Sequence, residues 1–124
     1  MNEALIYIGS GIIMIWGIAH IIPTKAIVKG FGAISGDNKK VLAMEVIAEG
    51  LTLIFLGMLP LLVTAIGDSQ SYTAHIVYLA VAVMLLVMAV VTLVTGARTP
   101  AIWYKICPAV KTAAAILYLT GSLM

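Results

Sequence analysis

Charged side chains are scarce in this chain of 124 residues. Asp, Glu, Lys and Arg make up 10% of it and hydrophobic residues 63%, whereas soluble domains carry about 25% charged residues. This number of charged residues is too small to cover the surface of a water-soluble fold. The composition therefore excludes an ordinary soluble domain. A net charge of +2, without a basic run interleaved with aromatic residues, also argues against nucleic acid as a partner.

Cysteine and histidine are equally scarce. A single cysteine, Cys107, excludes an intramolecular disulfide, a CxxC redox pair and a Cys-rich metal site. We expect this thiol to be inert packing, with a reactive thiol near Lys105 as the alternative. Neither histidine belongs to a Glu-x-x-His motif, which excludes a di-iron bundle. We expect His75 to be an exposed hairpin residue and not a ligand.

Long hydrophobic runs dominate what remains. Crossing about 30 Å of hydrocarbon takes about 20 helical residues, and four segments are long enough: 4–22, 41–66, 74–94 and 101–124. The sequence therefore predicts one all-α domain over residues 1–124, a polytopic membrane protein with a bundle of four transmembrane helices. Asp37 or Asn38 is placed to cap the second helix. A shorter last helix that begins at Pro108 is the alternative to one that begins at residue 101.

The basic residues predict the orientation. Six lie in the first loop or in the third loop and its helix edge, and the second loop and both termini have none. They are Lys25, Lys29, Lys39, Lys40, Arg98 and Lys105. By the positive-inside rule, we expect a multi-pass protein of the cell membrane with these two loops in the cytoplasm and both termini outside. The first loop is expected to lie on lipid headgroups, or alternatively to form an interfacial flap that contacts acidic lipid or covers a site.

Four ionisable residues inside the predicted spans are worth weighing, because such groups are costly in a membrane and are candidates for function. They are His20, Glu45, Glu49 and Lys111. All four fall in the cytoplasmic half, so the simplest packing gathers them in one cluster. Glu45 and Glu49 share a helix face, being four residues apart. Lys111 is the expected partner of Glu49, and His20 has the right depth for Glu45.

Each member of this cluster has a functional and a structural interpretation. As candidate catalytic residues we name Glu49, Glu45 and His20, and as candidate ligand-binding residues Lys111, Trp16 and Tyr118. The alternative is a buried ion pair that sets the register of the helices. His20, Glu45 and Glu49 are a weak set of metal ligands, so the sequence assigns no metal site, and the cofactor stays unknown.

Small residues recur along the predicted helices. Gly9, Gly17, Gly50 and Gly57 can form seams that allow close helix approach, within one chain or between two copies. On this basis we expect a homodimer.

Residues 44–57, MEVIAEGLTLIFLG, resemble the second-helix pattern of the DoxX-like families, in which a Glu precedes a Gly and an apolar run leads to another Gly. The order of helices and loops is similar over the whole chain. The resemblance implies a small four-helix membrane protein, some relatives being associated with quinone-linked or sulfur redox chemistry. Only Glu49, by its place before Gly50, corresponds to the motif, and the His20–Thr24 element has no counterpart in it.

Three functions stay open, and the motifs do not decide whether the chain is an enzyme. The first is binding of a small hydrophobic or lipid-like molecule, such as a quinone, in an accessory role. The second is an enzyme that uses Glu acid–base chemistry on a lipid-like substrate. The third is a proton-coupled transporter of small solutes that works as an oligomer. Besides such a molecule, membrane lipid and a second copy of the chain, the sequence indicates no partner.

Overall fold

The computed structural model describes residues 1–124 and confirms an all-α protein with four helices long and apolar enough to span a membrane. These four helices are α1 (Glu3–Ile21), α3 (Gly36–Ile66), α4 (Tyr72–Val94) and α5 (Ile102–Leu123). A short helix, α2 (Thr24–Lys29), lies in the first loop, and a 3-10 turn, η1 (Gly96–Arg98), lies in the third. The chain is therefore a multi-pass membrane protein.

The second span begins five residues earlier than expected, at Gly36 instead of residue 41. Its N-cap is Ser35, whose hydroxyl accepts a hydrogen bond from the Asn38 backbone N–H at 3.1 Å. The expected cap, Asp37 or Asn38, is therefore wrong. Asp37 lies in the first turn, where its carboxylate complements the positive end of the helix dipole. Hydropathy marks only the apolar part of a helix, so it missed this polar first turn.

The last span begins at Ile102 and continues through Pro108, so a helix that begins at the proline is excluded. Nine residues of helix separate Ile102 from Lys111, or about 14 Å at 1.5 Å per residue. The lysine therefore lies well inside the span.

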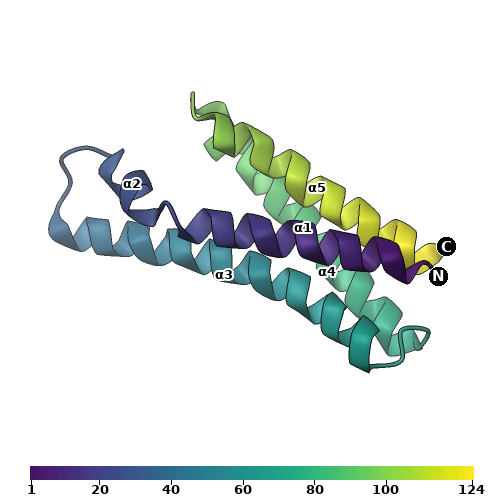
Figure 1. Cartoon of the computed structure of the whole chain (residues 1–124). Helices are drawn as coiled ribbons and strands as arrows, with labels where there is room; N and C mark the ends of the chain where they lie inside the picture. Colours follow the sequence, from purple (N-terminus) through teal and green to yellow (C-terminus); the bar gives the residue numbers. More distant parts are fainter.

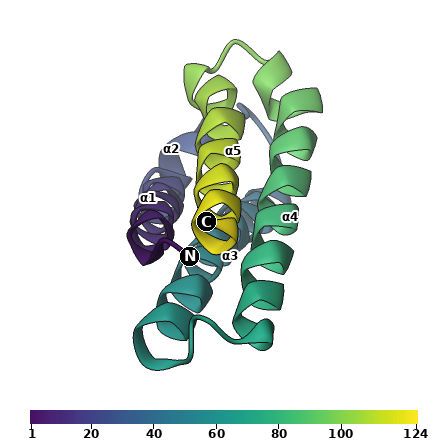
Figure 2. The ribbon, with the colours of Figure 1, turned by 90° about the vertical axis from the view of Figure 1, so that its right-hand side faces the viewer.

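Both termini lie at one end of the bundle, next to the α3–α4 hairpin, and α2 and η1 lie at the other (Figure 1). Helix α1 packs along α3 and α5, and α4 packs along α5. Figure 2 shows α5 between α1 and α4. The Met1 ammonium group donates to the Met124 carbonyl, and Ser69 Oγ donates to Glu3 Oε1 at 2.5 Å. These contacts hold the start of α1 to the end of α5 and to the hairpin.

Glycines let α1 and α3 approach closely. A Cβ atom on Gly17 would lie 2.7 Å from the Gly50 carbonyl oxygen, and one on Gly57 would lie 2.9 Å from the Ser10 carbonyl oxygen. Gly9 faces the Tyr118 ring of α5 in the same way, at 3.2 Å. These glycines are therefore used inside one chain, and the homodimer stays a prediction that the seams do not support.

Replacing Gly17 tests the α1–α3 seam. We expect Gly17→Ala to lower the stability in detergent by about 1–3 kcal/mol, because the new methyl group meets backbone atoms that cannot move aside. The matched control is Gly11→Ala on the same helix, where a Cβ atom has no neighbour within 4 Å. The measurement is the thermal unfolding midpoint, and equal midpoints for both variants would disprove the seam.

Candidate functional site

An ion pair joins α3 and α5 inside the bundle. Lys111 Nζ lies 2.6 Å from Glu49 Oε1, as the sequence predicted. The Lys111 side chain is completely buried, whereas that of Glu49 is 36% exposed. A buried ammonium group is tolerated in apolar surroundings only when an opposite charge and hydrogen bonds replace its water. Glu49 supplies the charge, and its exposed edge gives the pair one open side.

Thr92 of α4 is a third member that the sequence analysis missed. Its hydroxyl accepts a hydrogen bond from Lys111 Nζ at 3.0 Å and donates one to the Met88 carbonyl at 3.0 Å. A threonine that bonds to its own helix is common in membrane helices, so the sequence carried no signal for this role. Lys111 thus connects three of the four spans.

His20 faces the other carboxylate oxygen of Glu49. Its Nε2 atom lies 3.6 Å from Glu49 Oε2, and its Nδ1 atom lies 3.2 Å from the Trp16 carbonyl oxygen. A carbonyl oxygen only accepts, so Nδ1 carries the hydrogen in that bond. In the neutral ring, the Nε2 lone pair then points toward Glu49. The expected pairing of His20 with Glu45 is wrong.

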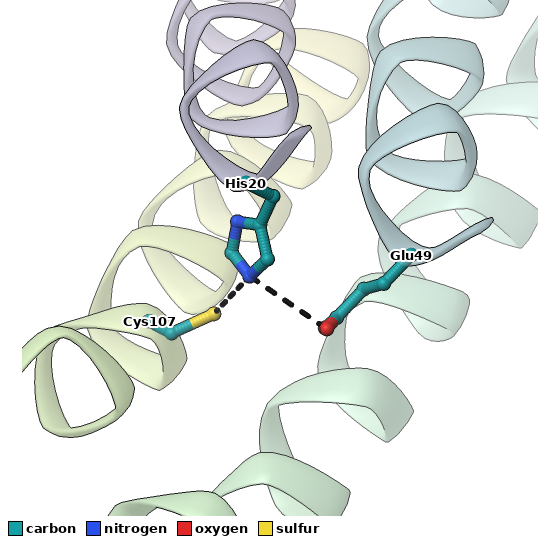
Figure 3. A group of neighbouring side chains, drawn as sticks. All are labelled: His20, Glu49 and Cys107. Atoms are coloured by element: carbon teal, nitrogen blue, oxygen red, sulfur yellow. Dashed lines mark hydrogen bonds and ion pairs between the residues drawn. The ribbon is translucent and has the colours of Figure 1, made fainter. Parts of the chain in front are cut away.

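Cys107 completes the cluster from α5. Its Sγ atom lies 3.8 Å from His20 Nε2 and accepts a hydrogen bond from Trp16 Nε1 at 3.2 Å. The thiol is 1% exposed. Figure 3 shows the imidazole edge between the sulfur atom and the carboxylate. The prediction of inert packing missed these polar contacts, which arise only when α1 and α5 are side by side.

Three atoms of the kinds that bind metal ions therefore converge from three helices. The nearest ligand atoms of His20, Glu49 and Cys107 all lie within 4.8 Å of one another. Metal–ligand bonds of about 2.0–2.3 Å at tetrahedral angles place neighbouring ligand atoms about 3.3–3.8 Å apart. The observed 3.6 Å and 3.8 Å from Nε2 are close to that spacing. The carbonyl bonded to Nδ1 is the outer contact that orients ligating histidines.

Two predicted site residues lie outside the cluster. Glu45 is exposed and makes no hydrogen bond or ion pair. Tyr118 is completely buried further along α5, hydrogen-bonded to Ser10 Oγ at 3.2 Å and to the Leu56 carbonyl at 3.1 Å. The hydrogen bonds of its hydroxyl group are thus made within the bundle. His75 also lies elsewhere, half-buried in the first turn of α4 with its ring plane at 78° to that of Tyr78, so the expected exposed hairpin position is wrong.

Comparison of the chain with protein-family models, with curated proteins and with solved structures finds no match. The resemblance to DoxX-like families stays a prediction, and the function is argued from the site alone.

A double-mutant cycle tests the Glu49–Lys111 pair. Glu49→Gln leaves the fully buried ammonium group without a counter-charge, which typically costs about 3–5 kcal/mol in soluble proteins. Lys111→Met should cost less, because the Glu49 carboxylate is partly exposed. The double variant should recover much of the loss, since no charge stays unpaired. Unfolding midpoints in detergent measure all three, with Glu45→Gln as the neutral control. Additive losses in the double variant would contradict the pairing.

Proposed function

We propose that this membrane protein binds one soft metal cation at His20, Glu49 and Cys107. The observation that carries the proposal is the convergence of an imidazole nitrogen, a carboxylate oxygen and a sulfur atom within 4.8 Å of one another. Thiolate and imidazole together favour soft or borderline cations such as Cu(I) and Zn(II) over Mg²⁺ or Ca²⁺. Trp16 Nε1, which donates to the sulfur atom, would stabilise the thiolate form that binds metal.

The charge of the site favours a monovalent cation. A Cys107 thiolate, the Glu49 carboxylate and the Lys111 ammonium group leave one net negative charge beside a neutral His20. A monovalent ion brings the sum to zero, whereas a divalent ion leaves one positive charge inside the bundle. Uncompensated charge is expensive at membrane depth. Lys111 holds Glu49 Oε1 and leaves Oε2 toward His20, so the ion pair and the metal ion use different oxygens.

A lipid-soluble small molecule that contacts Glu49 is the second candidate. The observation in its favour is the 36% exposure of the Glu49 side chain, the one charged group of the cluster that is open toward the surroundings. The quinone-like ligand expected from the sequence would bind there through a hydrogen bond to the carboxylate. Its other expected contacts are weaker, because Lys111 and Tyr118 are completely buried and already hydrogen-bonded.

We also propose that the end with α2 and η1 faces the cytoplasm. Six basic residues belong to this end and none to the end with the termini. The positive-inside rule then puts the metal site in the cytoplasmic half of the membrane, because His20 lies one residue from the end of α1.

Metal binding is tested with Ag(I), a soft monovalent probe, and with Zn(II), by competition with a chelator of known affinity. We expect the wild type to bind one Ag(I) per chain, more tightly than Zn(II), with a thiolate-to-metal charge-transfer band in the near ultraviolet. Cys107→Ala and His20→Ala should each weaken Ag(I) binding by at least about 100-fold, since each removes a ligand.

The chain provides matched controls for these variants. His75→Ala removes the other histidine, and Glu45→Gln removes an exposed carboxylate on α3, the helix that carries Glu49. Both variants should bind Ag(I) like the wild type. Binding that survives in Cys107→Ala, or that falls equally in His75→Ala, would refute the metal site. A co-purified lipid-soluble molecule, together with no metal binding, would favour the second candidate.

Orientation is tested by cysteine labelling in a Cys107→Ser background, where no other thiol remains. We expect Ser71→Cys, in the hairpin, to react with an impermeant thiol reagent added to intact cells. Gly36→Cys, at the start of α3, should react only after the membrane is opened. The reverse pattern would place the metal site in the outer half of the membrane.

A further inference from the structure

A second polar feature lies outside the metal cluster, in a groove between α2 and the start of α3. The groove has a volume of about 300 Å³. Three lysines from both helices line it, together with one hydroxyl group and two small or branched apolar side chains. These residues are Lys25, Lys29, Lys39, Thr24, Val28 and Ala43.

The three ammonium groups of the groove have no anionic partner. Lys25 and Lys29 are four residues apart on one face of α2, and Lys39 approaches from the first turns of α3. None of them makes an ion pair, and no carboxylate lines the groove. Like charges held together repel one another, so an anion between them would relieve the repulsion. A group with several acceptor oxygens, such as a phosphate, suits three ammonium donors.

The position of the groove indicates where such a phosphate comes from. α1 ends at Ile21 and α2 begins at Thr24, so the groove lies where the first span leaves the hydrocarbon. Val28, which lines the groove, is 9% exposed, and the apolar side chains of Phe31, Val41 and Met44, each within two residues of a lining residue in the chain, are exposed. A polar groove beside apolar surface matches a molecule with an anionic head and acyl chains, which free phosphate lacks.

We propose that the groove between α2 and α3 binds the phosphate headgroup of an anionic glycerophospholipid, with its acyl chains along the exposed apolar face of α3. The ammonium groups of Lys25, Lys29 and Lys39 hold the phosphate. The lipid thereby joins the loop containing α2 to α3, the helix that carries Glu49. This site is independent of the proposed metal ion, since the two share no residue.

The test measures binding of phosphatidylglycerol to the purified full chain in detergent, by titration and native mass spectrometry. We expect one tightly held phosphatidylglycerol per chain and no comparable binding of phosphatidylcholine, whose headgroup is neutral overall. The variant with Lys25→Gln, Lys29→Gln and Lys39→Gln should bind phosphatidylglycerol on the order of 100-fold more weakly, given about a fivefold contribution from each lysine near a membrane surface.

The matched control removes the same number of charges from the same end of the bundle. It combines Lys40→Gln, Arg98→Gln and Lys105→Gln, none of which lines the groove. We expect this variant to bind like the wild type. A second variant, Ala43→Phe, keeps every charge but fills the groove, and should also lose the lipid. Unfolding midpoints identify any variant that is damaged as a whole.

Three outcomes would overturn the proposal. Equal weakening in both lysine variants would show diffuse attraction to basic residues without a defined site. Equal binding of phosphatidylcholine would show that the anionic phosphate is not recognised. Inorganic phosphate that displaces the lipid completely at low millimolar concentration would identify free phosphate as the ligand, because acyl chains would then contribute nothing.

Discussion

The buried ammonium group of Lys111 is the constraint on which the half of the bundle toward α2 and η1 depends. A charge inside an apolar bundle needs its counter-charge and hydrogen bonds at fixed positions. Glu49 of α3 supplies the first, and Thr92 of α4 supplies an acceptor. Because these two partners belong to different helices, one lysine determines how α3, α4 and α5 lie relative to one another at this level. The remaining span, α1, has no charge at this level except on His20 when its ring is protonated.

The glycine seam brings α1 to the same point. Gly17 follows Trp16 in the chain, and Gly50 follows Glu49, so one close approach of α1 and α3 lies beside the polar cluster. Close backbone contact at this position carries His20 to 3.6 Å from the Glu49 carboxylate. It also lets Trp16 reach across to the Cys107 sulfur. The assembly of the site therefore depends on the packing of these small residues.

The two ends of the molecule differ in how completely their polar groups are paired. At the end with the termini, the Met1–Met124 contact joins α1 to α5, and the Glu3–Ser69 contact joins α1 to the α3–α4 hairpin. The other half of the molecule contains the partly exposed Glu49 carboxylate, inside the span, and the unpaired lysines of the groove at its end. The proposed metal site and the proposed lipid site both belong to this half. A bound headgroup would contact the first turns of α3, the helix that positions Glu49 further along, so both proposals concern the first half of α3.

Hydropathy alone determined the four spans, because a run of about 20 apolar residues can satisfy its backbone hydrogen bonds in lipid only as a helix. Sequence also predicted the Glu49–Lys111 pair, because two opposite charges at similar depth in the membrane are each costly unless they pair with one another. It paired His20 with Glu45 instead of Glu49, because residues four apart share one helix face and depth alone favoured Glu45. The roles of Cys107 and Thr92 were decided only by tertiary structure. A thiol and a hydroxyl are tolerated almost anywhere in a membrane helix, so their contacts depend on which helix faces are brought together.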